Sequence, residues 1–445
     1  MALQGVFEYL GLLLWSGWTG LLDYLAAHVL LCLVPAFVIA GYMSAMIPKE
    51  VVTKYLGPKA SRFISYPAAA AGGFVLAVCS CTILPLFAGI WKRGAGLGPA
   101  ITFLFVGPAV NILAIAYTGA VIGMDIALAR IILSIIFGIG IGLIMAYLFR
   151  AEEATRAAEM ADSGMFAGEA QVKPAVWAVF AMLVGVLLVG TLQLDVLTGT
   201  WFSLRLPIEL PAGLLNTLAS VNLAPQGALL ILMLVIIGPV AYFGLENVLE
   251  RFNRWTYAAM TLVALTLLMA APTFAEGSVV IGITGRFVGE VLLIGAIGVV
   301  AARSFERYEI AEWLWETWKF VKQIFPLLIA GVFLAGVVRV ILPEQWVQSL
   351  AGRNTLFANL IGVVFGVLMY FPTLVEVPIA RMFLDLGMHR GPLLAYLLAD
   401  PELSLQSILV TGKILGRRKT IAYVSLVAVF STLAGYLFGL ALTVL

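Results

Sequence analysis

LAVCSCTILPLFAGIWKRGAGLGPAITFLFVGPAVN, residues 76–111, is the stretch that decides the fold. It carries two of the chain's three cysteines, Cys79 and Cys81, inside an apolar run. A proline in a helix interior removes a backbone hydrogen bond, and three of them interrupt this run: Pro85, Pro99 and Pro108. The stretch therefore predicts broken helices at membrane depth. A second, weaker copy of the stretch lies near the C-terminus.

The composition around this stretch is that of a membrane protein. Of the 445 residues, 62% are hydrophobic and 11% are charged, whereas soluble domains carry about 25% charged residues. The long unbroken apolar runs exclude an outer-membrane barrel, whose strands alternate. No basic patch with interleaved aromatic residues indicates nucleic acid as a partner. We therefore expect an all-α polytopic membrane protein whose first partner is the lipid bilayer.

The chain contains an internal repeat. Residues 39–57 can be laid over residues 334–352, where glycines and prolines match at an offset of 295. The offset then becomes 293, and Pro85, Gly94, Gly98, Pro99 and Pro108 fall on Pro378, Gly387, Gly391, Pro392 and Pro401. Such matches are less common by chance than matches between apolar residues. The sequence predicts a first repeat (1–149), a polar linker with a four-helix middle section (150–302) and a second repeat (303–445).

Basic loops predict the orientation, because cytoplasmic loops carry an excess of Lys and Arg. Loops 48–62, 92–93 and 150–173 all look cytoplasmic, which conflicts with one full span between the first two. The conflict disappears if residues 63–91 form a re-entrant hairpin, with residues 355–381 as a twin that enters from the other side. The result is an inverted-topology repeat with about ten spanning helices, as in many secondary transporters. The alternative is twelve full spans with parallel halves, which leaves one basic loop on the wrong side.

Cys79 and Cys81 form a C-x-C pair at a predicted helix break and can point both sulfurs at one site. Thiolates select soft ions such as Cu(I), Zn(II) or trivalent arsenic-like centres. The alternative is that each cysteine serves as a small apolar residue in a tight hairpin turn. No C-x-x-C motif or histidine cluster indicates a structural zinc site. We therefore predict no resident metal and no cofactor.

Three carboxyl groups lie in the second copy, where the first has apolar residues or glycine: Glu376, Asp400 and Glu402. Intramembrane carboxylates cost several kcal/mol, so they are functional candidates by default. We predict a role in proton coupling. The alternatives are a position near the membrane interface, or ion pairs with Arg381 or Arg390.

Further polar residues lie at the predicted helix breaks: Ser80, Thr82, Asn111 and Thr373. They could coordinate a ligand, or they could cap the broken helices. With the two cysteines they form the predicted substrate-binding set. No residue is assigned a catalytic role.

The opening stretch resembles the signature of the ArsP/YraQ-like permeases. That signature is a CSC followed by a proline, a glycine-rich turn and an FL…P…N element. Its elements here are Cys79-Ser80-Cys81, Pro85, Gly94 to Gly98, and Phe103-Leu104…Pro108…Asn111. The resemblance implies a multi-pass permease of the bacterial inner membrane. Some members are linked to efflux of trivalent organoarsenicals and others to metal ions, which implies that Cys79 and Cys81 contact the substrate.

The leading hypothesis is a secondary transporter, not an enzyme, that exports a small thiophilic substrate, with proton coupling as a further hypothesis. One alternative is a transporter of a small sulfur-containing anion or another metabolite, because helix N-termini at the hairpin tips suit anions. Another is an intramembrane thiol oxidoreductase, which usually needs a partner thiol or a quinone site, and a third is a channel. The sequence leaves open the substrate, the coupling ion, the direction of transport and whether the chain forms a homo-oligomer.

Overall fold

The computed structural model describes residues 2–26, 33–47, 49–58, 60–76, 80–162, 173–191, 195–209, 211–220, 223–268, 272–275, 278–341, 345–368 and 376–444. In these ranges the regular elements are helices and three strands. It divides into two compact units. Unit 1 comprises Met1–Trp18, Pro48–Ala170 and Ile324–Leu445, and unit 2 comprises Thr19–Ile47 and Gln171–Gln323.

Unit 1 contains most of both predicted repeats. Its helices in the first repeat are α3 (Lys49–Leu56), α4 (Arg62–Leu76), α5 (Ser80–Lys92), α6 (Leu97–Ala109), α7 (Ile112–Val121), α8 (Met124–Leu148) and the following α9 (Arg150–Asp162). Its helices in the second repeat are α17 (Gln345–Ala351), α18 (Leu356–Leu368), α19 (Glu376–Asp385), α20 (Arg390–Ala399), α21 (Leu405–Leu415) and α22 (Arg417–Val444). Two helices have residues in both units: α1 (Ala2–Tyr24) and α16 (Arg307–Ile341).

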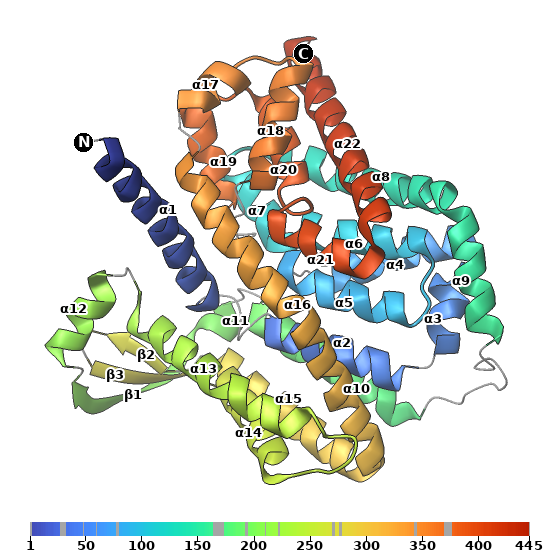
Figure 1. Ribbon diagram of the computed structural model, residues 1–445, viewed down its shortest axis with the longest axis vertical. Helices are drawn as coiled ribbons and strands as arrows, with labels where there is room; N and C mark the ends of the chain where they lie inside the picture. Colours follow the sequence, from blue (N-terminus) through green and yellow to red (C-terminus); the bar gives the residue numbers. More distant parts are fainter. Residues whose placement is uncertain are drawn as a thin grey trace. The chain divides into compact units, whose positions relative to one another are not determined.

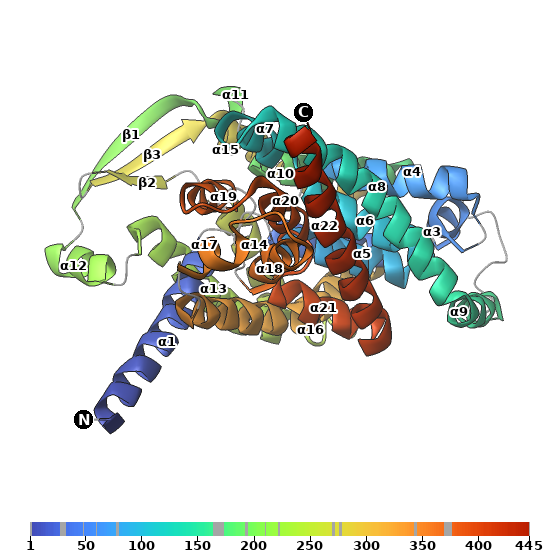
Figure 2. The same ribbon diagram turned by 90° about the horizontal axis from the view of Figure 1, so that it is seen from above.

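Unit 2 contains most of the predicted middle section. Its helices are α2 (Val34–Met46), α10 (Pro174–Thr191), α11 (Asp195–Thr198), α12 (Ala212–Ser220), α13 (Pro225–Leu245), α14 (Arg254–Leu268) and α15 (Gly285–Ser304). Its strands are β1 (Thr200–Glu209), β2 (Pro272–Ala275) and β3 (Ser278–Thr284), which form an antiparallel sheet in the order β1-β3-β2 (Figure 2). Leu204 lies opposite Ile281, and Thr273 lies opposite Val280.

This small sheet adds to the helical fold that the sequence predicts. Its strands lie in connecting segments between the apolar segments of the middle section. The sequence of β3 is SVVIGIT, and β-branched residues such as valine and isoleucine favour strands. That enrichment is the signal from which β3 could have been predicted.

The prediction of a helical polytopic membrane protein is confirmed. Among the described residues, the helices long and apolar enough to cross a membrane are Met124–Leu148, Pro225–Leu245, Gly285–Ser304, Arg307–Val337 and Arg417–Leu442. A sixth span results if α6 and α7 count as one, bent by 46°. The shorter apolar helices are Val34–Met46, Thr82–Lys92, Pro174–Gly190, Leu356–Leu368 and Leu405–Leu415. Within the described ranges, the long spans are fewer than the ten or so predicted, and one apolar segment is divided by the break between α6 and α7.

Each half contains an equivalent backbone hydrogen bond, and the two bonds are related by the offsets read from the sequence. Gly96 N donates to Leu56 O over 2.7 Å, and in the second half His389 N donates to Ala351 O over 3.0 Å. The first bond brings together the two ends of the segment that holds α4 and α5, so this segment returns to where it began. A hairpin over residues 63–91 requires such closure, although its re-entrant path stays a prediction.

The turns that follow α5 and α19 share one backbone conformation. Gly94 has a φ of 96° and Gly387, 293 residues later, has a φ of 92°. Side chains disfavour this left-handed region, whereas glycine adopts it readily. The matched glycines therefore mark one local fold that occurs twice, while the inverted orientation of the halves stays a prediction.

Each half is built on three packed helices. In the first half α6 contacts both α4 and α8, and in the second half α20 contacts both α18 and α22 (Figure 1). All of α6 and the residues Gly391–Ala399 of α20 are buried. Small residues permit the close approach: a methyl group on Gly435 of α22 would lie 2.5 Å from Gly391 O of α20.

Gly142 tests the same contact in the first half. Gly142→Ala should lower the free energy of unfolding by about 1–3 kcal/mol, the usual effect of overpacking, because the methyl group would lie 2.6 Å from Gly98 O. Gly140→Ala on the same helix is the matched control, since nothing lies within 4 Å of a methyl group there. Thermal unfolding of the two purified variants measures the difference. Equal stability would contradict the close packing of α6 on α8.

The halves also contact each other reciprocally within unit 1. α19 of the second half contacts α7 of the first, and α5 of the first half contacts α21 of the second. α7 and α21 begin 293 residues apart, at Ile112 and Leu405. Two halves related by a two-fold axis produce reciprocal contacts of this kind. The contacts bring the broken helices to the boundary between the halves.

Candidate functional site

Four charged side chains meet in the interior of unit 1, and we call them the buried charge cluster: Arg130, Glu376, Asp400 and Glu402. No member of the cluster is more than 4% exposed. Charged residues are almost never buried to this degree unless they are paired. The members come from α8, from the start of α19 and from the turn after α20.

Arg130 is the centre of the cluster. Its Nη1 lies 2.5 Å from Oε1 of Glu376, the first residue of α19, and both side chains are almost wholly buried. Its Nε donates to the carbonyl of Ala109 over 3.2 Å. Ala109 is the last residue of α6, and the last carbonyls of a helix have no partner within it. Arg130 therefore links the helix break of the first half to a helix of the second half.

The break between α6 and α7 follows from its sequence. Pro108 lies at the end of α6, and α7 begins at Ile112. Between them, Asn111 Oδ1 accepts a hydrogen bond from Ala114 N over 3.4 Å. This hydrogen bond caps the start of α7. Helix capping is the alternative to ligand coordination that the sequence offers for Asn111. A ligand contact of Asn111 stays a prediction.

Asp400 lies at the corresponding break of the second half, directly after α20 and before Pro401. Within the described part of the chain, no N–H or hydroxyl group donates to either of its carboxyl oxygens. Its carboxyl does lie beside that of Glu376, within hydrogen-bonding reach. A hydrogen bond between two carboxyl groups needs a proton on one of them. A hydrogen bond between Asp400 and Glu376 would therefore require one of the two carboxyl groups to be protonated.

Glu402 uses one of its two carboxyl oxygens. Its Oε2 accepts a hydrogen bond from the hydroxyl of Tyr423 in α22 over 2.9 Å. Its Oε1 has no hydrogen-bond partner among the residues described. The same is true of the buried hydroxyl of Tyr396, which lies close enough to Asp400 and Glu376 to interact with their charges. The cluster thus has both acceptor and donor capacity left over.

The cluster holds more acidic than basic groups. Three carboxyl groups face one guanidinium, the group of Arg130. An unpaired charge in an apolar interior is very unfavourable, so full ionisation would require a compensating ion. Uptake of protons by the carboxyl groups removes this excess charge. Protonation of the carboxyl groups is therefore one way in which the excess charge of the cluster can be balanced.

The three carboxyl groups predicted from the sequence are thus close together, but their partner was not foreseen. Arg381 pairs with Asp385 over 3.0 Å, and Arg390 pairs with Asp125 over 2.6 Å. The alternative that Arg381 or Arg390 neutralises the carboxyl groups is therefore wrong. Nor is Glu376 at an exposed edge of the unit, since it is fully buried.

Sequence reasoning missed Arg130, although a signal was present. Arg130 is a basic residue within Met124–Leu148, a helix with a mean hydropathy of 2.6 in its most apolar window. Ionisable residues inside such helices are functional candidates by default. Tyr423, which binds Glu402, had no comparable signal, because tyrosine is common in membrane helices near the interface.

The predicted substrate-binding residues are described only in part. Cys79 and Thr373 lie outside the described residues. Ser80 and Cys81 begin α5, but the positions of their side chains are also outside the described part. Thr82 is buried in α5. A contact between these residues and a substrate stays a prediction.

The start of α5 nevertheless lies near the buried charge cluster. Ile83, two residues after Cys81, packs against Gly107 of α6, where a methyl group would lie 2.7 Å from Ile83 Cδ1. Two residues further along α6, Ala109 accepts the hydrogen bond from Arg130. Ile83 of α5 and Arg130 of the cluster therefore both contact the C-terminal end of α6.

Within the ranges that the structure covers, no three His, Cys, Asp or Glu side chains are grouped so that they could hold a metal ion. Cys79 is not part of those ranges. The structure therefore describes the charged side chains of the candidate site. The positions of the two thiol groups lie outside the described part.

Comparisons with known proteins agree over most of the chain. The ArsP_1 family, described as "Predicted permease", matches residues 15–440. The curated "UPF0718 protein MJ0584" of Methanocaldococcus jannaschii is 34% identical over 428 residues, which cover 95% of this chain and 94% of that protein. No solved structure matches the chain. Both matches include the two halves and the middle section.

Proposed function

The chain belongs to the ArsP_1 family of predicted permeases, and from this premise we propose that it is a proton-coupled secondary transporter of the cell inner membrane. Its substrate is a small thiophilic species, such as a trivalent organoarsenical or a soft metal ion, which it exports. Membership of this family favours a transporter over the alternative of an intramembrane thiol oxidoreductase.

The buried charge cluster is the observation that carries the proposal. The pair between Arg130 and Glu376 connects α8 of the first half to α19 of the second. A proton on Glu376 removes one charge of this pair and weakens the connection. Because Asp400 lies beside Glu376, a proton can be exchanged between their carboxyl groups. Proton binding is thereby linked to the contact between the halves, which alternating access requires to change.

The internal repeat supports the same mechanism. The hydrogen bonds at Gly96 and His389 recur at the predicted offset, and the contacts of α5 with α21 and of α19 with α7 are reciprocal. Inverted repeats of transporters have their substrate site where broken helices of the two halves meet. The boundary between the halves, next to Ala109 and Asp400, is therefore the proposed substrate position.

Replacing the cysteines tests the thiophilic substrate. Cys79→Ser and Cys81→Ser should each reduce the resistance of a sensitive host to a trivalent organoarsenical to that of a host without the protein, because a hydroxyl is a poor ligand for soft centres. Cys32→Ser is the matched control, since it removes the third cysteine of the chain and lies outside the CSC stretch. Growth curves and immunoblots of each variant measure resistance and expression. Unchanged resistance in well-expressed variants would eliminate the thiophilic substrate.

A small sulfur-containing anion is the second candidate substrate. Arg130 Nη2 has no hydrogen-bond partner among the described residues, and a guanidinium N–H suits an anionic oxygen. Competition in proteoliposomes separates the candidates. An anion such as thiosulfate should inhibit arsenical transport only if both occupy one site, and transport of the anion without the arsenical would favour the second candidate.

A further inference from the structure

The two long helices of unit 1, α8 and α22, meet through equivalent residues. Phe137 of α8 and Phe430 of α22 lie 293 residues apart, the offset that relates the halves. Their rings pack edge to face, with centroids 5.2 Å apart. In a two-fold arrangement, a residue contacts its own equivalent where it lies beside the axis. The ring pair therefore marks where an axis between the two halves would pass.

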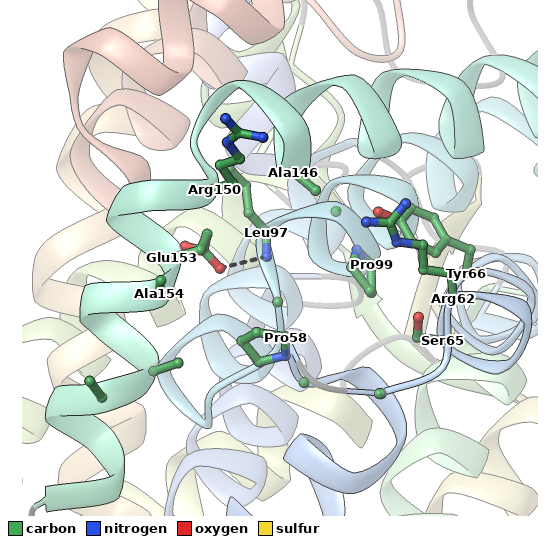
Figure 3. A pocket seen from close by; sticks show the side chains of 16 residues that line it. Pro58, Arg62, Ser65, Tyr66, Leu97, Pro99, Ala146, Arg150, Glu153 and Ala154 are labelled. Carbon is green, nitrogen blue, oxygen red and sulfur yellow. Dashed lines mark hydrogen bonds between the residues drawn. The ribbon is translucent and has the colours of Figure 1, made fainter.

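Beyond the C-terminal end of α8, α9 is tied to the start of α22. Nζ of Lys419 lies 3.2 Å from Glu152 Oε2 and 3.8 Å from Glu153 Oε1. Glu153 Oε2 also accepts a hydrogen bond over 3.0 Å from the N–H of Leu97, on the wall of a cavity of about 470 Å³ (Figure 3). The side chains of Glu153 and Lys419 are only 9% and 11% exposed. One buried carboxylate thus connects the start of α6 to the start of α22, which belongs to the other half.

The same junction holds the end of α5 and the turn that follows. Arg156 of α9 donates hydrogen bonds to the carbonyls of Trp91 and Ala95. Its guanidinium lies 3.4 Å from the centroid of the Trp91 ring, and Lys419 Nζ lies 5.6 Å from it. A cation over the face of tryptophan is attracted to the ring. The contact at this end therefore includes α5, the helix that begins in the CSC stretch.

At the start of α8, one ion pair makes the equivalent connection. Asp125 Oδ2 lies 2.6 Å from Nη2 of Arg390, the first residue of α20 and the counterpart of Leu97 at the offset of 293. The two side chains are 42% and 36% exposed. Gly123, with a φ of 144°, permits the approach, because a methyl group there would lie 3.0 Å from Arg390 Nη2. The start of α20 thus meets α8 as the start of α6 meets α22.

The two contacts lie at opposite ends of a membrane span. Asp125 is the second residue of α8, and Glu153 follows the last residue of α8 by five positions. With 25 residues, α8 is about 37 Å long, more than the hydrocarbon core of a bilayer. Phe137 lies between the two contacts, 12 residues after Asp125. A break in either contact would therefore separate the halves at one side of the membrane.

We propose that these two contacts are the gates of the transporter, and that they open in turn as the halves rock about the pair of Phe137 and Phe430. The inference rests on the proposed function, because alternating access opens the substrate site to one side at a time. Both gates are closed in this structure. An exposed ion pair contributes little, whereas breaking a buried one leaves a charge unpaired. The gate at Asp125 therefore opens more readily than the gate at Lys419.

Labelling of an introduced cysteine tests the gates without a substrate. The reporter is Asn111→Cys, at the break between α6 and α7, in the full-length chain with its three native cysteines replaced by serine. A membrane-impermeant maleimide is added to vesicles of either orientation. Asp125→Asn should raise the labelling rate about two- to fivefold from the side of Asp125, because the rate follows the open fraction. Lys419→Gln should raise it roughly tenfold or more from the side of α9.

Asp385→Asn is the matched control, because it breaks an exposed ion pair within α19 and should leave both rates unchanged. The charge reversal Asp125→Arg/Arg390→Asp should return the rate to that of the reporter chain, which a loss of folding would not do. The proposal is overturned if neither gate variant changes the rate, if both raise it from the same side, or if the reversal restores nothing. Labelling needs neither an arsenical nor a proton gradient, so a failure of the proposed substrate or coupling is detected separately.

Discussion

Arg130→Met should reduce the free energy of unfolding by about 3–5 kcal/mol, because it leaves the buried carboxyl of Glu376 without its cationic partner. It also removes the hydrogen bond from Arg130 Nε to Ala109 O at the end of α6. The double variant Arg130→Met/Glu376→Gln should recover part of the loss, since no unpaired charge remains. Unfolding of the purified variants in detergent measures all three free energies and completes a double-mutant cycle.

The matched control for Arg130 is Arg381→Met. Arg381 also pairs with a carboxylate, that of Asp385, but the two side chains are 51% and 59% exposed. Exposed ion pairs contribute about 0–1 kcal/mol, so this variant should stay close to the wild type. A loss in Arg130→Met no greater than that in Arg381→Met would show that the buried pair does not hold α8 to α19.

Asp400→Asn should abolish transport that is driven by a pH gradient and should leave downhill exchange of substrate in place. An amide cannot take up and release a proton in the physiological range, and Asp400 is the carboxyl that has Glu376 as its neighbour and no N–H or hydroxyl donor among the described residues. Everted membrane vesicles measure accumulation of the substrate with and without a gradient. With the gradient, the variant should reach only the level that the wild type reaches without it.

Asp385→Asn controls for the loss of one carboxylate. Asp385 is exposed and pairs with Arg381 on the helix that begins with Glu376. Its amide variant should keep transport driven by the gradient. If Asp400→Asn retains full accumulation, Asp400 is not the coupling group, and Glu402→Gln becomes the variant to examine.

The repeat could be read from the sequence because its markers are backbone requirements. Gly94 and Gly387 match at an offset of 293, and both adopt a positive φ that only glycine adopts readily. Pro108 likewise lies in the last turn of α6, and Pro401 follows the end of α20 by two residues. Residues that set the backbone path leave a mark that does not depend on knowing their neighbours.

The partner of Glu376 could not be read in this way. Arg130 is 246 residues away, and no local pattern predicts which distant helices pack together. Arg381 and Arg390 were considered because they are near in sequence, yet each pairs elsewhere. The presence of one arginine in an apolar helix was visible, but its pairing needed the three-dimensional fold.

Helix length was the other part that the sequence did not determine. Apolar runs suggested about ten spans, but α6 and α7 are separate helices that meet at 46°. An apolar run looks the same whether its helix continues or breaks, unless a proline or a cap marks the break. Asn111, which caps α7 by accepting from Ala114 N, was one such mark.

The central claim is that the buried charge cluster couples proton movement to transport. The internal pH of proteoliposomes, recorded with a trapped dye while a trivalent organoarsenical moves across the membrane, tests it most directly. The account predicts a pH change that depends on the substrate in the wild type and no such change in Asp400→Asn. Substrate movement without a pH change in the wild type, or an undiminished pH change in the variant, would contradict it.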